Sequence, residues 1–353
     1  MPPTPTVESA VRARADNTPI LSVRELKTYF HLTEGIVRAV DGVSFDVRPG
    51  RTLGIVGESG CGKSITARSI LGIVDKPGRI EAGEIWLNGS AEDPTAPPVD
   101  LAALAPSSPQ MRAIRGKEIA LIFQEPMSSF SHYYTVGNQI MEAIREHSDA
   151  TKDEAHARAI ELLRTVGVPQ PERRVDEYPF QLSGGLRQRV MIAMALACDP
   201  RILIADEPTT ALDVTTQAQI LDLLRKLREE TGTAIVLITH DLGVVAETCD
   251  DVAVMYAGEI VELAPAQALF AAPQHPYTVG LLGSIPLISA TRERLLTISG
   301  SVPTLSGRFT GCRFAARCPF ADAHCRAQAP PLAAVGASHL SRCWKAPLEA
   351  LVA

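Results

Sequence analysis

Apolar residues recur with two different periods along this chain, and the two periods predict strands and helices. Apolar and polar residues alternate over 20–30 and 36–47, which is typical of half-buried strands in an antiparallel sheet. Further on, short apolar runs alternate with segments of helical spacing, which indicates a mainly parallel sheet with helices on both faces. We predict strands at 53–56, 118–123, 201–205, 234–239, 252–255 and 259–263, and helices at 65–73, 135–147, 152–166, 185–198, 215–230 and 242–248.

Other parts of the chain depart from this alternation. Residues 1–19 are rich in Pro, Thr and Ala and predict a disordered tail. Residues 89–109 have little periodicity, so we interpret them as a surface excursion without chemistry. The helices within about 124–198 form an insertion in the α/β alternation. We find no internal repeat and therefore expect one α/β domain over 20–265, followed by a small extension over 266–353.

Composition narrows the class of protein. Of 353 residues, 46% are hydrophobic and 21% are charged, which is ordinary for a globular protein. Lys and Arg number 34 against 40 Asp and Glu, and the basic clusters are short, so we expect no nucleic-acid partner. No apolar run approaches the ~20 residues that span a bilayer. The first residues lack the basic-then-apolar order of a secretory signal, so we expect the protein to stay in the cytosol.

The segment from Gly57 to Ser64 fits the phosphate-binding pattern G-x-x-x-x-G-K-S/T between a predicted strand and a predicted helix. Its glycines let backbone amides face phosphates, and the helix N-terminus adds fixed positive potential. We expect Lys63 to contact the β- and γ-phosphates and the Ser64 hydroxyl to ligate Mg²⁺. In this field Cys61 is either an oxidisable thiolate or an ordinary small loop residue. The expected nucleotide contacts are Gly57, Ser59, Gly60, Cys61, Gly62, Lys63 and Ser64.

Two adjacent acidic residues end the predicted strand 201–205. The carboxyl end of a parallel strand delivers side chains to the ligand crevice of the sheet. We expect Asp206 to hold Mg²⁺ through water, and Glu207 to orient and deprotonate the attacking water, because phosphoryl transfer depends on positioning and charge neutralisation. Two acids at a strand end are more often a helix cap, but the phosphate loop upstream favours the catalytic interpretation.

The run Leu182-Ser183-Gly184-Gly185 resembles the signature that separates ABC ATPases from other P-loop proteins. The resemblance implies a RecA-like parallel sheet core, an antiparallel β subdomain and an α-helical subdomain. In this family the signature of one subunit caps the γ-phosphate bound by its partner, so Ser183, Gly184 and Gly185 are expected to reach the nucleotide of a second ATPase subunit. The usual glutamine after the signature is Leu186 here, which resembles the Met of peptide-importer ATPases.

Other residues match the family one by one. Gln124, after the strand 118–123, resembles the Q-loop glutamine, which touches Mg²⁺ and water and reports to the membrane subunit. Asp213 ends a segment, 211–213, that resembles the D-loop, which meets the opposing phosphate loop across the dimer. His240 resembles the switch histidine that contacts the γ-phosphate. The resemblance therefore implies Glu207, His240 and Gln124 as catalytic residues, and Ser64, Gln124 and Asp206 as the Mg²⁺ site.

Phe30 aligns with the aromatic residue of the family that stacks on adenine, and neighbouring Tyr29 is a substitute for that role. Stacking on an aromatic face adds roughly 1 kcal/mol beyond burial. The alternative is that Phe30 is an ordinary core residue.

Four cysteines, Cys312, Cys318, Cys325 and Cys343, crowd the last part of the chain, and in a reducing compartment such crowding favours metal over disulfides. Together with His275-Pro276-Tyr277-Thr278, this run resembles the C-terminal tail of oligopeptide and dipeptide importer ATPases. In that family the four thiolates resemble ligands of a 4Fe-4S cluster. Gaps of five, six and seventeen residues do not match zinc knuckles. Four thiolates suit both metals, so zinc and metal-free thiols remain alternatives, as do His324 and His339 as substitute ligands.

The resemblance implies an ATP-hydrolysing subunit of an importer for di- or oligopeptides. Its expected partners are a second, identical or homologous, ATPase subunit, two transmembrane permease subunits and, indirectly, an extracytoplasmic binding protein, and its expected place is the cytoplasmic face of the inner membrane. Residues 127–134 differ from the sequence that is usual in this family after the Q-loop. Close relatives of peptide importers carry oligosaccharides or nickel, so these cargoes are alternatives. A soluble, non-transport ABC ATPase of DNA repair or translation is a further alternative. Such a protein is expected to show a long coiled coil, tandem ATPase domains or a basic surface, and the sequence shows none of these.

Overall fold

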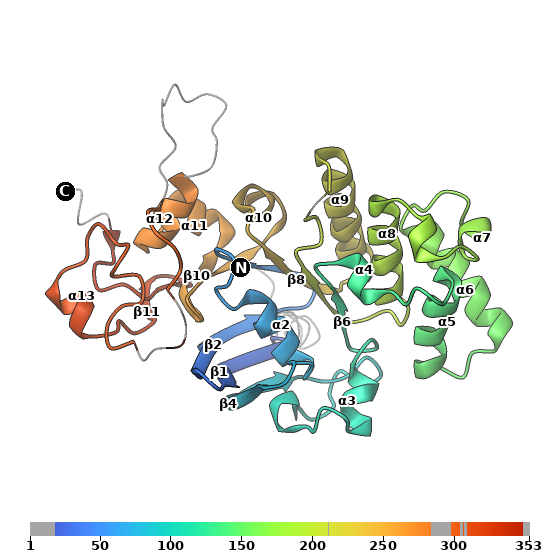
Figure 1. The fold of residues 1–353 in the computed structure, drawn as a ribbon, viewed down its shortest axis with the longest axis horizontal. Coiled ribbons are helices and arrows are strands. Elements are labelled where there is room, and N and C mark those ends of the chain that lie inside the picture. Colours follow the sequence, from blue (N-terminus) through green and yellow to red (C-terminus); the bar gives the residue numbers. More distant parts are fainter. Residues whose placement is uncertain (1–17, 211, 284–297, 304–305, 307–308, 349–353) are drawn as a thin grey trace, which may run out of the picture.

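A computed structural model describes residues 18–210, 212–283, 298–303, 306 and 309–348. Almost all of the predicted tail, 1–19, lies outside these residues. The predicted strands and helices are present, with ends shifted by a few residues. The molecule is elongated, with the helical insertion at one end and the C-terminal extension at the other (Figure 1).

An antiparallel sheet opens the chain. Its strands are β1 (Leu21–Leu32), β2 (Gly35–Val47), β4 (Gly78–Leu87) and β5 (Val99–Asp100), in the order β2-β1-β4-β5. Strand β4 was not predicted, because glycines at 78 and 83 and a mostly exposed first half weaken its alternation. One face of the sheet packs on the helix that follows the phosphate loop, and there the buried hydroxyls of Thr28 and Ser69 lie 2.7 Å apart.

A second, larger sheet forms the centre of the molecule. Its strands are β3 (Thr52–Val56), β6 (Ile119–Ile122), β7 (Ile202–Asp206), β8 (Ala234–Thr239), β9 (Asp251–Tyr256), β10 (Glu259–Pro265), β11 (Ala333–Gly336) and β12 (His339–Ser341). Their order is β11-β12-β10-β9-β3-β8-β7-β6, and the pairs from β9 to β6 are parallel. Every residue of β3, β7 and β8 is buried, as expected of parallel strands covered on both faces.

Helices cover both faces of this sheet. Figure 1 shows α9 (Val214–Thr231) and α10 (Leu242–Thr248) on one face and α2 (Lys63–Ile70) on the other. The helical insertion packs around an apolar cluster that includes Ile140, Leu163 and Val190 and continues into the central sheet at Leu203 and Leu237. Its main helices are α5 (Val136–His147), α6 (Lys152–Thr165) and α8 (Gly184–Ala195), and its short ones are α4 (Pro126–Ser129) and α7 (Pro171–Arg174).

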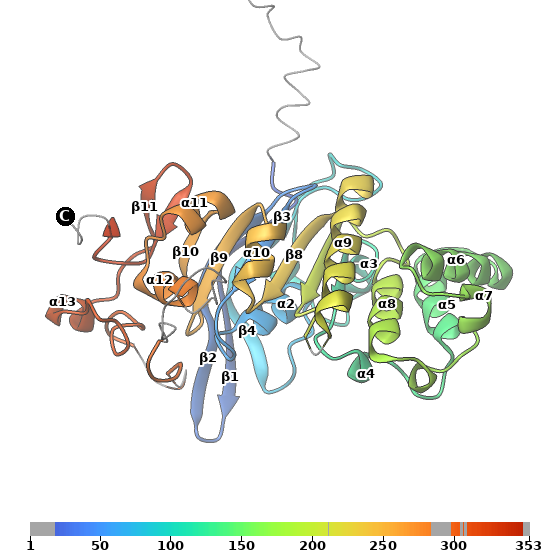
Figure 2. The ribbon, with the colours of Figure 1, turned by 90° about the horizontal axis from the view of Figure 1, so that it is seen from above.

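The C-terminal extension continues the central sheet. Strand β12 pairs with β10, with Glu262 opposite Ser341, and β11 pairs with β12. Seen from above, this part of the chain lies beside β10, far from the helical insertion (Figure 2). Its helices are α11 (Ala266–Ala271), α12 (Pro276–Gly283) and α13 (Ala323–Ala327). The extension is therefore attached to the ATPase sheet through backbone hydrogen bonds as well as through side chains.

The stretch 89–109 lies mostly at the surface, as expected, but it contains short regular elements. It contains β5 and the 3-10 helix η1 (Leu101–Ala103), and α3 (Pro109–Ile114) begins at its end. Leu101 is buried in the core, and a carboxylate oxygen of Asp100 accepts a hydrogen bond from the Ile85 backbone. This packing was not predicted, because a single buried leucine produces no periodic pattern.

Candidate active site

The phosphate loop connects the end of β3 to the start of α2, and its shape requires glycine. Gly57 has φ 153° and Gly62 has φ 104°, which side chains of L-residues rarely adopt. A Cβ atom on Gly57 would lie 2.2 Å from the Met255 carbonyl oxygen, and one on Gly62 would lie 2.2 Å from that of Ala39. Backbone from two neighbouring strands therefore encloses the loop and sets its path.

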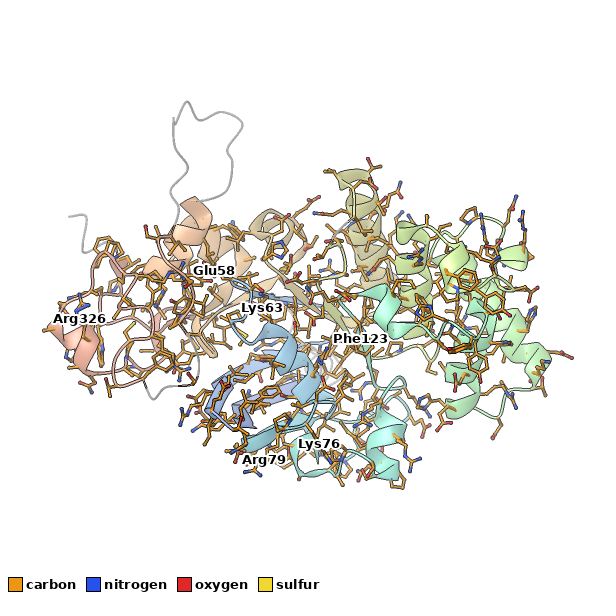
Figure 3. The ribbon with its side chains drawn as sticks, viewed as in Figure 1. Glu58, Lys63, Lys76, Arg79, Phe123 and Arg326 are labelled. Atoms are coloured by element: carbon orange, nitrogen blue, oxygen red, sulfur yellow. The ribbon has the colours of Figure 1, made fainter. Side chains whose placement is uncertain are left out.

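Lys63, at the first position of α2, is directed back onto the loop. Its Nζ donates hydrogen bonds to the carbonyl oxygens of Gly57, at 2.8 Å, and of Glu58, at 3.1 Å. The residue is 5% exposed. Figure 3 shows Glu58 and Lys63 where the first strands meet the C-terminal part of the chain. The lysine ammonium is thus held at the mouth of the loop by backbone oxygens.

Ser64 and Asp206 form a pair of oxygen donors beside the loop. The Ser64 hydroxyl donates to Asp206 Oδ1 at 3.0 Å, which joins the start of α2 to the end of β7. Burial raises the pKa of the Asp206 carboxyl, the Ser64 hydrogen bond opposes this, and the charge of Glu207 adds to it. A divalent cation at this position would favour the carboxylate, and oxygen donors of this type are those that Mg²⁺ prefers.

Glu207 lies where the carboxyl ends of β6, β7 and β8 come together. Its Oε2 accepts hydrogen bonds from Gln124 Nε2 at 3.2 Å and Thr210 Oγ1 at 2.8 Å, and its Oε1 lies 3.4 Å from His240 Nδ1. Glu207 itself has φ 48°, a left-handed conformation that costs of order 1–3 kcal/mol in a residue other than glycine. The structure thus brings the three predicted catalytic residues together, and it adds Thr210, which sequence reasoning missed.

The two aromatic candidates for adenine have different surroundings. Phe30 is half-buried on β1, between Val37 and Gly78 of the neighbouring strands. The Tyr29 hydroxyl donates to Asp41 at 2.6 Å, and burial together with this hydrogen bond raises the pKa of Tyr29 to about 12. The Arg38 guanidinium lies over the Tyr29 ring, 5.6 Å from its centroid, and covers one face of it, so Phe30 is the better candidate.

The signature and the D-loop aspartate do not join the phosphate loop within this chain. Ser183 is exposed at the start of α8, where its hydroxyl accepts from the Leu186 backbone at 3.4 Å, and Gly184 and Gly185 are the first two residues of the helix. Helix α8 lies apart from α2 in both views (Figures 1 and 2). Asp213 is also exposed and caps α9, while Ala211 of the same segment lies outside the described residues.

Cys61 is a small buried loop residue, which is the second of the two interpretations. Its side chain is 0% exposed, and burial raises the pKa of the thiol despite the opposing charge of Lys63. Burial and the raised pKa therefore favour an ordinary small loop residue over an oxidisable thiolate. The positive field of the loop favours the thiolate less than burial penalises it.

The four C-terminal cysteines, Cys312, Cys318, Cys325 and Cys343, line one small cavity, together with Phe314 and Trp344. Burial raises the pKa of Cys312 to about 11 and also raises the pKa values of Cys318 and Cys343. Among the described residues, no group of three or more His, Cys, Asp or Glu side chains is arranged to hold a metal ion.

The two histidines considered as substitute ligands have other neighbours. His339 is paired with Glu262 through a hydrogen bond of 2.7 Å. The ring of His324 packs against Trp344 with centroids 4.6 Å apart. Neither histidine lines the cavity, whereas the four cysteines do. His275 also lines it, and its Nδ1 accepts a hydrogen bond from the Tyr277 backbone.

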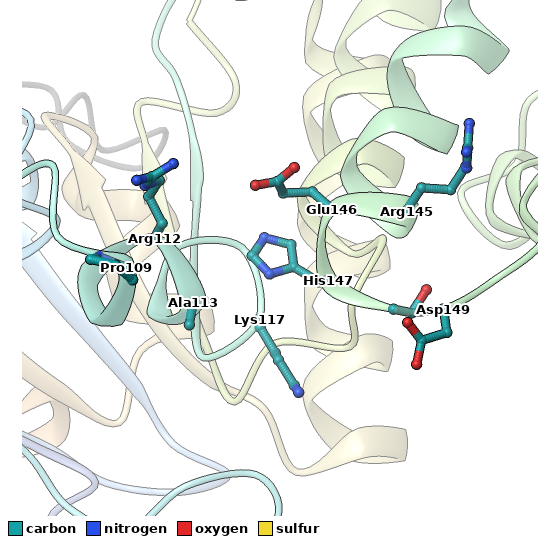
Figure 4. A pocket seen from close by; sticks show the side chains of 9 residues that line it. Pro109, Arg112, Ala113, Lys117, Arg145, Glu146, His147 and Asp149 are labelled. Atoms are coloured by element: carbon teal, nitrogen blue, oxygen red, sulfur yellow. The ribbon is translucent and has the colours of Figure 1, made fainter.

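A separate pocket of about 530 Å³ opens between α3 and the end of α5 (Figure 4). Basic Arg112, Lys117 and Arg145 alternate around it with acidic Glu146 and Asp149. Because both signs of charge surround it, the pocket favours neither anions nor cations, and we assign it no ligand.

Comparison with known proteins decides the family. A model of ABC transporters matches residues 40–210, and a model of the oligopeptide/dipeptide transporter C-terminal region matches residues 261–325. The probable peptide ABC transporter ATP-binding protein y4tR of Sinorhizobium fredii is 51% identical over 328 residues, which cover 92% of this chain and 95% of the relative. This chain belongs to the ABC transporter ATPases.

Two further comparisons support this membership. The dipeptide transport ATP-binding protein DppD of Escherichia coli is 48% identical over 324 residues, which cover 92% of this ABC ATPase and 96% of the relative. The dimeric post-hydrolysis structure of the ATP-binding cassette MJ0796 with ADP and Pi matches with a TM-score of 0.61 at 27% identity, covering 70% of this chain and 98% of that chain. The predicted ABC-type fold and ATPase activity are confirmed. None of the described helices is both long and apolar enough for a membrane span.

Proposed function

We propose that this ABC ATPase hydrolyses ATP to drive the import of di- or oligopeptides. The observation that carries the proposal is the combination, in one chain, of the ATPase site with the oligopeptide/dipeptide transporter C-terminal region. Relatives named for peptide and dipeptide transport align over nearly their whole length, which supports the same role here. An oligosaccharide or nickel importer is the second candidate, because residues 127–134 differ from the usual family text.

The roles of the site residues follow from their positions. Lys63 and the amides of the phosphate loop bind the β- and γ-phosphates, and Ser64, Asp206 and Gln124 supply oxygens that would hold Mg²⁺. Mg²⁺ neutralises phosphate charge when bound. Glu207 takes the proton of the attacking water, because its carboxylate is held by Gln124 and lies beside His240. His240 donates toward the γ-phosphate from the adjacent strand end.

A second ATPase subunit would complete each site. Ser183 and Asp213 are exposed and lie on elements other than the phosphate loop. The hydroxyl and free amides at the start of α8 form an anion site of the kind found at helix N-termini. The cassette MJ0796 is dimeric, which supports the same arrangement here. We propose that Ser183, Gly184 and Gly185 of one subunit cap the nucleotide bound by the other.

The membrane partners would contact the chain after Gln124. Two adjacent side chains, Tyr133 and Tyr134, are 88% and 59% exposed there. Exposed aromatic residues are common at protein interfaces. We propose that this surface meets two permease subunits at the cytoplasmic face of the inner membrane, and that an extracytoplasmic binding protein delivers the cargo to them.

We also propose that the C-terminal cysteines hold a metal cofactor of structural role, a 4Fe-4S cluster, with zinc as the alternative. Four thiols line one cavity that is closed by aromatic side chains, and soft sulfur donors suit iron–sulfur clusters and zinc alike. When bound, the cofactor would crosslink a segment that has few regular elements. This proposal concerns the extension, and no step of hydrolysis involves it.

Uptake assays test the transported cargo. A strain that lacks this gene would receive either the wild-type gene or the Glu207→Gln variant, and uptake of labelled dipeptide, oligosaccharide and nickel would be measured. We expect the wild type alone to restore dipeptide uptake. Restoration of oligosaccharide or nickel uptake without dipeptide uptake would contradict the proposal and support the second candidate.

A further inference from the structure

Glu58, the second residue of the phosphate loop, is held by residues from the C-terminal extension. Both carboxylate oxygens of Glu58 accept hydrogen bonds from the Arg317 guanidinium, at 2.6 Å from Nη1 to Oε2 and 2.9 Å from Nη2 to Oε1. The backbone N–H of Glu58 donates to the Tyr277 hydroxyl at 2.9 Å. The side chain and the backbone of one loop residue are therefore both bound by the extension.

Backbone carbonyl groups and an aromatic ring hold the Arg317 guanidinium in one orientation. Its Nε donates to the Ser299 carbonyl at 2.9 Å and its Nη2 to that of Gly300 at 3.1 Å, while the group lies 5.7 Å from the ring centroid of Tyr256. The Arg317 side chain is 5% exposed, and its pKa is raised chiefly by the hydrogen bond to Glu58. A charged guanidinium in a bidentate pair fixes its partner in both position and direction.

Tyr277 is held as firmly as Arg317. It is fully buried on α12, and its ring packs against those of Tyr256 and Phe314, with centroids 4.7 and 5.4 Å away. The hydroxyl reaches Glu58 from this aromatic cluster. Phe314 belongs to the segment between Cys312 and Cys318, so the part of the extension that carries the cysteines also supports the contact with the loop.

The charge and the backbone position of Glu58 both affect phosphate binding. An unpaired carboxylate at Glu58 would repel the phosphate charges that this loop is built to accept. Lys63 donates to the carbonyl oxygen of Glu58, so a shift of the Glu58 backbone also moves the lysine ammonium.

We propose that the extension is a positioning element of the ATP site, in which Arg317 neutralises and orients Glu58 and Tyr277 fixes its backbone. Arg317 and Tyr277 are positioning residues, because they act through Glu58. This inference rests on the phosphate-binding role of the loop proposed above. It gives the extension a function in ATP affinity in addition to any cofactor that its cysteines hold.

Binding of a fluorescent ATP analogue and steady-state hydrolysis by the full chain test this inference. We expect Arg317→Ala to raise both the Kd for the analogue and the KM for ATP roughly tenfold, which corresponds to about 1.4 kcal/mol, while kcat changes less. Arg317→Lys keeps the charge but loses the bidentate geometry, so its KM should lie between those of Arg317→Ala and the wild type. Tyr277→Phe keeps the ring packing and loses only the hydroxyl, so we expect a smaller increase.

The double variant Glu58→Gln/Arg317→Ala isolates the role of charge. Because the neutral amide does not repel phosphate, its Kd should return toward the wild-type value. Arg342→Ala is the matched control, because Arg342 joins the extension to the Ile260 carbonyl and does not contact the loop. An unchanged Kd in Arg317→Ala, an equal increase in Arg342→Ala, or no recovery in the double variant would each overturn the inference.

Lys63→Ala separates this inference from the proposed ATP site. Loss of nucleotide binding in Lys63→Ala with no effect of Arg317→Ala would contradict the positioning role alone. Full binding in Lys63→Ala would instead contradict the phosphate-binding role of the loop. Thermal unfolding of each variant establishes that the compared proteins are folded.

Discussion

Glu207 Oε1 and His240 Nδ1 lie 3.4 Å apart, because they follow neighbouring parallel strands in register. Asp206 at the end of β7 is opposite Ile238 of β8, and the Glu207 backbone N–H donates to the Ile238 carbonyl at 2.9 Å. The residues that follow the two strands therefore reach the same edge of the sheet. This register places the proposed base and the proposed switch histidine beside each other.

Replacing Glu207 by glutamine should stop hydrolysis and preserve binding. The amide oxygen of glutamine still accepts from Gln124 and Thr210, but it does not take a proton, so we expect kcat to fall about 10²–10⁴-fold. Phosphate release measures the rate, and size-exclusion chromatography with ATP measures dimer accumulation. Glu247→Gln is the control, because Glu247 is an exposed glutamate on α10. Wild-type turnover in Glu207→Gln would show that another group is the base.

The enclosed path of the phosphate loop predicts different effects for two of its glycines. Gly57→Ala places a Cβ 2.2 Å from the Met255 carbonyl, whereas a Cβ on Gly60 has nothing within 4 Å. We expect Gly57→Ala to lose ATP binding and at least ~2 kcal/mol of unfolding free energy, and Gly60→Ala to lose about 1 kcal/mol for its left-handed backbone alone. Denaturant unfolding and nucleotide titration measure both, and equal losses would contradict the steric argument.

Because Asp206 is buried, we expect the stability of the nucleotide-free protein to depend on pH. Burial raises the folded-state pKa of this carboxyl above its ordinary value of 3.8. The folded protein then binds the proton more tightly than the unfolded chain does. The Asp206 carboxyl therefore destabilises the fold progressively as the pH rises from its ordinary pKa to its raised folded-state pKa. We expect Asp206→Asn, which keeps an acceptor for Ser64, to unfold at a higher temperature than the wild type at pH 7. The difference should vanish below the ordinary pKa.

Thermal unfolding over a pH series measures this difference. Asp176→Asn is the control, since Asp176 is an exposed acid of the helical insertion and its replacement should give no such difference. An Asp206→Asn variant that is less stable than the wild type at pH 7 would contradict the burial argument.

The proposed 4Fe-4S cluster in the cysteine cavity would absorb visible light. Anaerobically purified wild type should absorb broadly near ~400 nm and contain about four irons per chain. Cys318→Ser should lose both, whereas Cys198→Ser should retain both because Cys198 lies outside the cavity. Metal analysis with absorbance spectroscopy measures them. A colourless wild type with one zinc per chain would support the alternative metal.

Local pattern was enough to predict most elements of the fold and the residues that end its strands. Asp206 was expected at a ligand site because it follows an apolar strand downstream of a phosphate loop, whereas the resemblance to the ABC family implied Gln124 and His240. The structure brings all three to one edge of the sheet. Thr210 carried no such signal. It reaches Glu207 through a tight turn in which its N–H donates to the Glu207 carbonyl at 3.2 Å.

The order of residues in this chain thus specifies its periodic elements, its phosphate loop and its resemblance to the ABC family, because each of these depends on neighbours close in sequence. Folding in three dimensions determines the rest. Glu58 and Arg317 are 259 residues apart and meet because α12 and the cysteine segment pack beside β9 and β10. Packing between segments far apart in sequence, including Val40 and Ala253, likewise buries Cys61 and raises the pKa of its thiol. Burial and charge pairing depend on which distant segments become neighbours. Local sequence patterns do not predict these long-range contacts.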